Sequence, residues 1–331
     1  MRINVAVIGA GSWGTTVAAL AAENADTVLW SRRETLADAI NNHHVNTDYL
    51  ADFTLPQQLR ATTDLRAAVA TADVLVMAVP SHGYREVAAQ AAPYLRPWVP
   101  VVSLVKGIER SSLKRMSEVT AEEMPGHPVA VLTGPNLAKE ILAGQPAASV
   151  VAINDGTIAS ELQRIFSRPS LRIYTNPDVV GCEVSGVVKN IIAIAAGMAE
   201  GMGFGENTRA TLITRGLAEM TRLGMALGAS AGTFAGLAGM GDLIATCSSK
   251  QSRNNTVGLR LGEGQAIKDI LAGMNMVAEG VKSSPPVLDL ARRYGVEMPI
   301  TEQVVAVCHH GRSARDALTA LMQRTTNSKL G

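Results

Sequence analysis

A glycine-rich turn near the start of the chain constrains the fold more than any other feature. The run GAGSWG at residues 9–14 follows the apolar stretch Val5–Ile8 and precedes a helical run. In a dinucleotide-binding unit, three glycines at this spacing allow a tight turn, close approach of the backbone to the pyrophosphate, and close helix–strand packing. The helix N-terminus offers amides and a positive dipole to the phosphates. This context favours a Rossmann unit that binds a dinucleotide over a merely structural turn.

The first half of the chain alternates apolar runs with helical segments. The apolar runs lack period-two alternation, as is typical of strands covered on both faces. Their alternation with helical segments predicts a doubly wound, mainly parallel sheet. The seven strands that we expect cover residues 5–8, 27–30, 74–79, 101–105, 129–132, 149–153 and 171–174.

The second half of the chain follows a different pattern. The strand–helix alternation stops near Gly181, and in residues 211–227 the apolar positions step by three and four, which marks one face of a helix. Thr301 is expected to cap another helix. We therefore predict an α/β class chain, with a Rossmann dinucleotide-binding domain over residues 1–186 and an all-α substrate and catalytic domain over residues 187–331.

Charge and composition exclude several classes of protein. The 30 Lys and Arg residues nearly balance the 29 Asp and Glu residues, so a general electrostatic hold on nucleic acid or on an anionic membrane is not expected. Three scattered cysteines suit a reducing compartment, and the six histidines show no metal-ligand spacing. The first predicted strand leaves no room for a signal peptide. We expect a soluble, cytoplasmic enzyme or binding protein with no metal, no nucleic-acid partner and no membrane insertion, and a small-molecule substrate if it is an enzyme.

The end of the second predicted strand bears on the choice of cofactor. Enzymes that use NAD usually place Asp or Glu there, where the carboxylate accepts hydrogen bonds from the ribose hydroxyls. This chain has Ser31 instead, followed by Arg32 and Arg33. Two guanidinium groups can bind a 2′-phosphate, although both can also be solvated surface charges. We expect NADPH or NADH as cofactor, with NADPH favoured.

Polar residues interrupt apolar segments at several points. Lys106 ends an apolar run at the strand end where open α/β sheets bind ligands. Lys189 lies in an apolar helix, where an unpaired ammonium is costly, so either an acid pairs with it or it transfers a proton with a lowered pKa. Asp242 is expected on a glycine-flanked loop. The cluster QSRNN at residues 251–255 fits a clamp for a phosphate or a small polar substrate.

Several sequence blocks occur together in a characteristic order. They are GAGSWGT at 9–15, KGIE at 106–109, GPNLAKE at 134–140, VKNIIAIAAG at 188–197, GFGENTRATLITRGLAEM at 203–220, LAGMGDL at 237–243, QSRNN at 251–255 and GVEMPIT at 295–301. With these blocks nearly the whole chain resembles the bacterial NAD(P)-dependent glycerol-3-phosphate dehydrogenases of the soluble, biosynthetic type. The resemblance implies reversible reduction of dihydroxyacetone phosphate to sn-glycerol 3-phosphate with NAD(P)H, which supplies the glycerophospholipid backbone. It also implies a helical domain similar to that of 6-phosphogluconate dehydrogenase.

The resemblance further implies roles for individual residues. Lys189 becomes the proton donor and acceptor. The residues implied to hold the substrate are Lys106, Gly134, Asn136, Lys189, Asp242, Ser252, Arg253 and Asn254, with Asn190 and Thr246 nearby. Those implied to line the cofactor are Gly9, Gly11, Ser12, Trp13, Gly14, Arg32, Arg33, Lys106, Ala138, Arg253, Val277 and Glu279. Asn136 and Leu137 depart from the family pattern of Ser or Thr followed by Phe, so a backbone contact there would survive and a hydroxyl contact would not.

Two other hypotheses remain open at this point. A reductase of the β-hydroxyacid or ketopantoate type, with the same architecture, would clamp a carboxylate and would not depend on a substrate phosphate. A catalytically silent NADPH sensor would keep the glycine turn but would need neither Lys189 nor Asp242. The chain is expected to form a homodimer.

Overall fold

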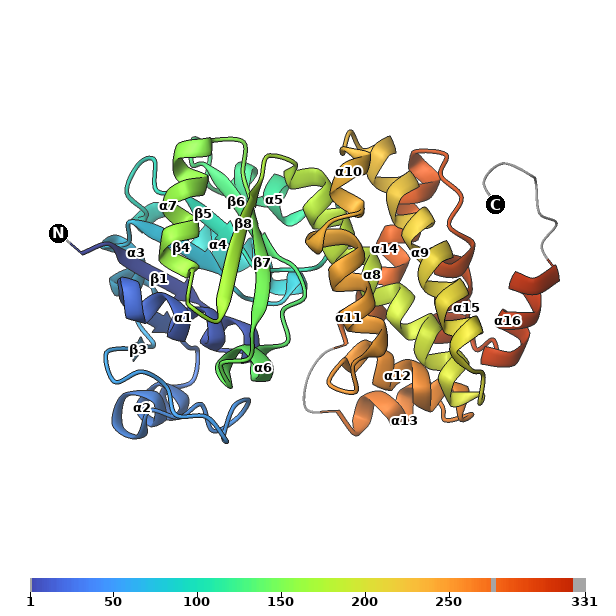
Figure 1. Ribbon diagram of the computed structural model, residues 1–331. Coiled ribbons are helices and arrows are strands. Elements are labelled where there is room, and N and C mark those ends of the chain that lie inside the picture. Colours follow the sequence, from blue (N-terminus) through green and yellow to red (C-terminus); the bar gives the residue numbers. More distant parts are fainter. Residues whose placement is uncertain (1, 275–277, 324–331) are drawn as a thin grey trace. The chain divides into compact units, whose positions relative to one another are not determined.

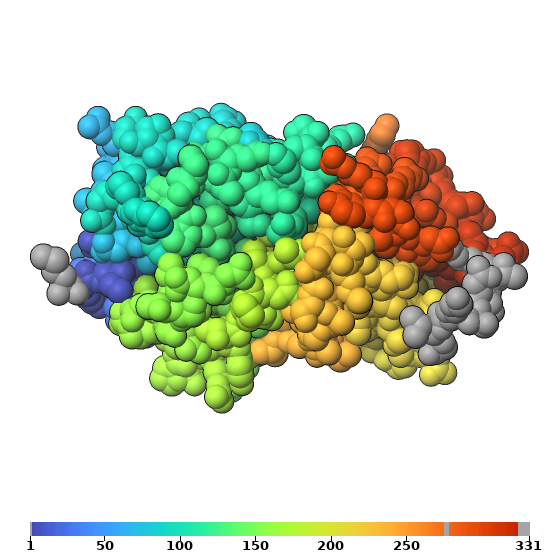
Figure 2. All heavy atoms as spheres, turned by 90° about the horizontal axis from the view of Figure 1, so that it is seen from above, coloured from blue at the N-terminus to red at the C-terminus, as the bar shows by residue number. Residues whose placement is uncertain are grey.

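The computed structural model describes residues 2–274 and 278–323 and divides the chain into two compact units. The N-terminal unit comprises Met1–Glu183, and the C-terminal unit comprises Val184–Gly331. The first unit contains a sheet with helices on both faces, and the second consists of packed helices (Figure 1). In the space-filling view the N-terminal unit is coloured from blue to green and the C-terminal unit from yellow to red (Figure 2).

An eight-stranded sheet forms the centre of the N-terminal unit. Its strands are β1 (Asn4–Ile8), β2 (Asp26–Trp30), β3 (Arg60–Thr62), β4 (Val74–Met77), β5 (Val101–Ser103), β6 (Val129–Thr133), β7 (Ala147–Ala152) and β8 (Leu171–Asn176). They lie in the order β3-β2-β1-β4-β5-β6-β7-β8, and every neighbouring pair is parallel except β6 and β7. The order from β3 to β6 is that of a dinucleotide-binding sheet, which binds ligands at the carboxyl ends of its strands. The predicted doubly wound, mainly parallel sheet is confirmed.

Helices cover both faces of this sheet (Figure 1). They are α1 (Ser12–Asn24), α2 (Glu34–His43), α3 (Leu65–Ala70), α4 (Tyr84–Ala91), α5 (Met116–Glu123), α6 (Ala138–Leu142) and α7 (Gly156–Phe166), with short 3-10 turns η1 (Ser81–Gly83) and η2 (Ala92–Tyr94). Successive residues of β1 point to opposite faces. Val5 and Val7 belong to one apolar cluster with residues of α1 and α7, whereas Ala6 and Ile8 belong to the other, with residues of α3, α4 and α5. Burial on both faces explains the unbroken apolar runs.

Every secondary-structure element in the described residues of the C-terminal unit, 184–274 and 278–323, is a helix or a helical turn. Its elements are α8 (Val179–Gly201), which begins in the N-terminal unit, α9 (Glu206–Ala226), α10 (Ala231–Phe234), the π-helical turn η3 (Leu237–Gly241), α11 (Asp242–Ser248), α12 (Arg253–Gly262), α13 (Ile267–Ala272), α14 (Glu279–Arg293), α15 (Pro299–His310) and α16 (Ala314–Gln323). By length and composition α8 alone among the described helices could cross a membrane, but 89% of its apolar window is buried, as in the core helix of a soluble protein.

Four glycines bring α8 and α12 unusually close together, namely Gly197 and Gly201 of α8 and Gly258 and Gly262 of α12. A Cβ on Gly197 of α8 would lie 2.2 Å from the Asn255 carbonyl oxygen, and one on Gly258 of α12 would lie 2.1 Å from that of Ile194. Real Cβ atoms essentially never come so near, so only glycine permits this packing. The close approach matters for function, because both helices carry candidate site residues.

The expectation that Thr301 caps a helix is wrong. Helix α15 begins at Pro299, and Thr301 lies inside its first turn. The side chain of Glu219, from α9, accepts hydrogen bonds from the backbone amides of Ile300 at 2.6 Å and Thr301 at 3.3 Å. Because these amides have a carboxylate partner from another helix, the turn needs no local cap. Burial raises the pKa of Glu219 to about 7.

Candidate active site

The glycine turn between β1 and α1 has the geometry of a phosphate cradle. Gly9 adopts φ +121°, and a Cβ there would lie 2.8 Å from the Ala78 carbonyl oxygen. A Cβ on Gly14 would lie 2.1 Å from the Gly9 carbonyl oxygen, so both glycines are required by packing. At Gly11, in contrast, a Cβ would meet no described atom within 4 Å, which leaves open space beside the backbone.

The first turn of α1 also suits an anion. It contains Ser12 and Trp13, and this fully described turn has no acidic side chain to repel a phosphate. The Nε1 atom of Trp13 is buried and has no hydrogen-bond partner among the described residues. Helix amides and the helix dipole attract phosphate at such a turn. The residues present therefore fit the pyrophosphate of a dinucleotide.

The hydroxyl of Ser31 forms hydrogen bonds with the backbone of the segment that follows β2. This buried hydroxyl accepts a hydrogen bond from the Arg33 amide and donates one to the Arg33 carbonyl, both at 3.2 Å. Arg32 is exposed, whereas the guanidinium of Arg33 forms an ion pair with Asp48 and lies 5.9 Å from the ring centre of Tyr49. A 2′-phosphate bound here would compete with Asp48 for Arg33. Sequence reasoning missed this carboxylate because it lies in the loop beyond α2.

Candidate substrate residues of the N-terminal unit meet where β5 and β6 end. Lys106 Nζ donates a hydrogen bond to the Gly134 carbonyl oxygen at 3.1 Å. Two residues further on, Asn136 accepts a hydrogen bond from the Ser149 hydroxyl, and its Nδ2 is buried with no partner among the described residues. A buried donor without a partner is uncommon and can serve a bound acceptor. Ala138, a candidate cofactor residue, begins α6.

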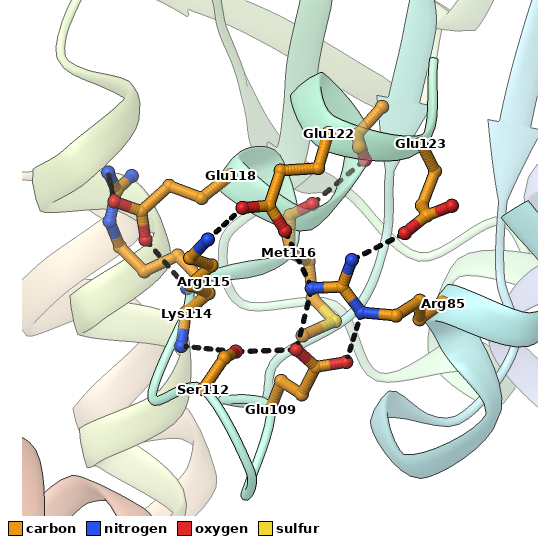
Figure 3. Close-up of polar contacts among 10 residues, drawn as sticks. Arg85, Glu109, Ser112, Lys114, Arg115, Met116, Glu118, Glu122 and Glu123 are labelled. Carbon is orange, nitrogen blue, oxygen red and sulfur yellow. Dashed lines mark hydrogen bonds and ion pairs between the residues drawn. The ribbon is translucent and has the colours of Figure 1, made fainter. Parts of the chain in front are cut away.

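The loop that follows β5 is held by Arg85 of α4 (Figure 3). Arg85 Nε and Nη2 each donate to a carboxylate oxygen of Glu109 at 2.8 Å, which makes a bidentate pair three residues beyond Lys106. The same guanidinium contacts Glu122, at 2.7 Å, and Glu123, both on α5. The Arg85 interaction lowers the pKa of the Glu109 carboxyl. Sequence reasoning did not find this network, because its members are ordinary surface residue types far apart in the chain.

In the C-terminal unit, Lys189 and Asp242 form a buried ion pair. Their Nζ and Oδ1 atoms are 2.7 Å apart, and the two residues are 6% and 1% exposed. Lys189 Nζ also donates to the Thr246 hydroxyl at 2.6 Å, and that hydroxyl donates to the Asp242 carbonyl oxygen at 2.6 Å. An acid therefore pairs with Lys189, as one of the two open hypotheses holds, and this acid is itself a candidate site residue.

The expectation that Asp242 lies on a loop is wrong. Asp242 is the first residue of α11 and directly follows the π-helical turn η3. Within that turn, a Cβ on Gly239 would lie 2.2 Å from the Phe234 carbonyl oxygen, so the glycine permits tight packing. π-helical turns are rare and occur often at functional sites. The glycine-rich stretch thus fixes the aspartate in place.

A second buried cluster joins three helices of the same unit. Asn254 Nδ2, on α12, donates to Asn190 Oδ1, on α8, at 3.0 Å. The backbone amide of Gly280, on α14, donates to Asn254 Oδ1 at 2.9 Å. Asn190 Nδ2 donates to the Gly186 carbonyl oxygen one turn earlier, at 3.2 Å. Both ends of the Asn254 amide are therefore used inside the protein.

Three other candidate residues of this unit are next to or close to that cluster in the sequence. Ser252 caps α12 by accepting a hydrogen bond from the Asn255 amide at 3.3 Å. Arg253 is exposed at the first position of the helix, and Glu279 is half-buried at the first position of α14. Val277 lies outside the described residues. Among the residues described, no three His, Cys, Asp or Glu side chains form a group that could hold a metal ion.

An open glycine turn on a Rossmann sheet, followed in the chain by a helical unit with a buried lysine–aspartate pair, fits the class of nicotinamide-dependent dehydrogenases. Family models for the N-terminus and the C-terminus of NAD-dependent glycerol-3-phosphate dehydrogenase match residues 4–159 and 178–319. The chain belongs to this family.

Individual relatives agree with this assignment. Glycerol-3-phosphate dehydrogenase [NAD(P)+] 2 of Sphingopyxis alaskensis is 55% identical over 329 residues, which cover 99% of each chain. Glycerol-3-phosphate dehydrogenase [NAD(P)+] of Thermobifida fusca is 54% identical and covers 97% of each chain. The crystal structure of glycerol-3-phosphate dehydrogenase from Coxiella burnetii has a TM-score of 0.93 and 37% identity, with 98% of this chain and 99% of that chain covered.

Proposed function

We propose that this chain catalyses the reversible reduction of dihydroxyacetone phosphate to sn-glycerol 3-phosphate with NAD(P)H and so supplies the glycerophospholipid backbone. The observation that carries the proposal is the buried Lys189 ammonium, 2.7 Å from Asp242, in a chain whose full length matches enzymes named for this substrate. Family membership favours this function over a reductase of the β-hydroxyacid or ketopantoate type. A silent NADPH sensor would need neither member of the buried pair.

Cofactor binding is assigned chiefly to the N-terminal unit. The backbone of Gly9, Gly11 and Gly14 and the first turn of α1 hold the pyrophosphate, because the turn is open at Gly11. Arg32 and Arg33 bind the 2′-phosphate, which favours NADPH. When bound, the nicotinamide supplies the hydride in reduction and accepts it in oxidation. The remaining residues assigned to the cofactor are Ser12, Trp13, Lys106, Ala138, Arg253, Val277 and Glu279.

Lys189 carries the proton. In reduction its ammonium protonates the oxygen of the carbonyl group as the carbonyl carbon is reduced, and in oxidation its neutral amine takes the hydroxyl proton. The Asp242 carboxylate compensates the buried ammonium charge, and the Thr246 hydroxyl, 2.6 Å away, helps to orient Nζ. A positioned acid of this kind typically accelerates a reaction about 10²–10⁴-fold.

The substrate phosphate is held by Arg253. Its guanidinium, exposed at the first position of α12, provides a charge-assisted hydrogen-bond donor, and the helix N-terminus adds amides. Lys106 and Asn136 Nδ2, which has no partner in the part of the chain that the structure describes, are the donors assigned to the other substrate oxygens, together with the Gly134 backbone. Binding energy from the remote phosphate helps to orient the reacting carbonyl.

We also propose where the enzyme acts, its oligomeric state and the role of each domain. The chain acts in the cytoplasm as a homodimer, without nucleic-acid partners and without membrane insertion, in keeping with its net charge of +1. Residues 1–186 form the dinucleotide-binding domain, and residues 187–331 form the substrate and catalytic domain.

A direct assay tests the proposed activity. Purified protein is mixed with dihydroxyacetone phosphate and NADPH or NADH, and the loss of reduced-nicotinamide absorbance is followed. We expect rapid oxidation with dihydroxyacetone phosphate and little with unphosphorylated dihydroxyacetone or with ketopantoate. Faster turnover of ketopantoate than of dihydroxyacetone phosphate would contradict the proposal.

A further inference from the structure

Each member of the cluster formed by Asn190, Asn254 and Gly280 is the sequence neighbour of a residue of the proposed site. Asn190 directly follows Lys189, Asn254 follows Arg253, and Gly280 follows Glu279 in the sequence. The three neighbours are therefore the proton carrier, the phosphate anchor and a cofactor residue. Local sequence gives no sign of the cluster, because its hydrogen bonds join residues 64 and 26 positions apart.

The hydrogen bonds of Asn254 fix its orientation. Its Oδ1 accepts from the Gly280 amide at 2.9 Å, and its Nδ2 donates to Asn190 Oδ1 at 3.0 Å. If the amide were flipped, two donors would face each other at Gly280 and two acceptors at Asn190. Asn254 is 8% exposed and Asn190 5%, so water could not readily replace the lost bonds.

Gly280 allows the third helix to join the cluster. A Cβ at this position would lie 2.6 Å from the Asn190 carbonyl oxygen and 2.8 Å from Asn254 Oδ1. The glycine is required by this close approach, not by a left-handed backbone. The start of α14, with Glu279, is thereby held directly against α8 and α12.

We propose that Asn254 is a positioning residue that couples cofactor binding to substrate binding. This inference rests on the proposed function. Inside the protein the side-chain amide of Asn254 uses Oδ1 and one of the two N–H groups of Nδ2. It holds the starts of α12 and α14 against α8, so that a ligand that orders Glu279 also orders Arg253 and Lys189. Coupling between two such sites typically changes affinity about 5–150-fold.

Binding measurements with a non-reacting pair of ligands test this coupling. Dihydroxyacetone phosphate and NADP+ cannot react with each other, since both are oxidised. Titration calorimetry gives the dissociation constant of dihydroxyacetone phosphate without NADP+ and with saturating NADP+. The ratio of these constants is the coupling factor, which we expect to be at least about fivefold in the wild type.

Two variants break the cluster and one matched variant leaves it intact. Gly280→Ala inserts a methyl group into the cluster, and Asn254→Ser removes the amide without a steric clash. Gly232→Ala is the control, because a Cβ there meets only Ser230 Oγ, at 3.8 Å. We expect the coupling factor to fall below a third of its wild-type value in the first two variants and to stay unchanged in the control. If Gly280→Ala fails to fold, the coupling factor of Asn254→Ser alone tests the inference.

The outcomes separate this inference from the proposed function. Wild-type protein that neither binds nor reduces dihydroxyacetone phosphate would refute the function. Active wild-type protein with a coupling factor of one would refute only the inference. The inference also fails if Asn254→Ser weakens dihydroxyacetone phosphate by the same factor with and without NADP+, as expected of a direct substrate ligand. Retention of wild-type coupling in folded Gly280→Ala protein would equally contradict it.

Discussion

The buried carboxylate of Glu219 is expected to make the stability of the C-terminal unit depend on pH. Burial raises its pKa from 4.5 to about 7. Between these values the folded protein holds a proton that the unfolded chain has released, so stability falls as pH rises through this window. A difference of about 2.5 pKa units at 1.36 kcal/mol each corresponds to about 3 kcal/mol. The loss is complete above about pH 7.

Glu219→Gln isolates this contribution. The glutamine keeps an acceptor oxygen for the Ile300 amide but does not titrate. The free energy of unfolding is measured by urea titration from pH 4.5 to pH 8 for wild type, for Glu219→Gln and for Glu302→Gln, an exposed control in the first turn of α15. We expect the stability of Glu219→Gln relative to wild type to rise by about 3 kcal/mol across the window. A difference that does not change with pH would refute the argument.

Three further predictions concern the proposed site. Arg32→Ala with Arg33→Ala should raise the KM for NADPH more than about tenfold and that for NADH much less, since each lost charge-assisted bond costs about 1.5–3 kcal/mol; equal effects in initial-rate assays would refute the 2′-phosphate assignment. Arg253→Ala should reduce kcat/KM for dihydroxyacetone phosphate at least about tenfold and leave that for dihydroxyacetone nearly unchanged; equal losses would make Arg253 structural. Glu109→Gln removes the bidentate carboxylate partner of Arg85 and should raise the KM for dihydroxyacetone phosphate several-fold through the Lys106 loop, whereas an unchanged KM would show that the network does not position Lys106.

Most of the sheet was predictable from the sequence, because a strand buried on both faces is a continuous apolar run. Strand β3 was missed, since it has three residues and only Ala61 among them is buried. The glycine turn was also predictable, because strand, turn and helix are contiguous in the sequence. Both features depend on residues that are close together in the sequence.

The arrangement of the site was less predictable, because its contacts join distant parts of the chain. The sequence indicated that Lys189 needs a partner, but its bond to Thr246 spans 57 residues and its acid was not identifiable from spacing. The loop expected around Asp242 is a π-helical turn, which has no simple sequence pattern. The cap expected from Thr301 is replaced by Glu219, 81 residues before Ile300. In each case tertiary packing overrides the local signal.

The most direct test of the central claim is the kcat of Lys189→Met for reduction of dihydroxyacetone phosphate at saturating NADPH. Methionine keeps an apolar stem of similar length and removes the ammonium, and Lys189→Arg serves as a charged control that holds its proton too tightly to exchange it. The account predicts that both variants fold, bind NADPH with wild-type affinity and lose about 10²–10⁴-fold in kcat. A Lys189→Met enzyme that keeps more than about a tenth of the wild-type kcat would contradict it and would leave Asp242 as the candidate proton carrier.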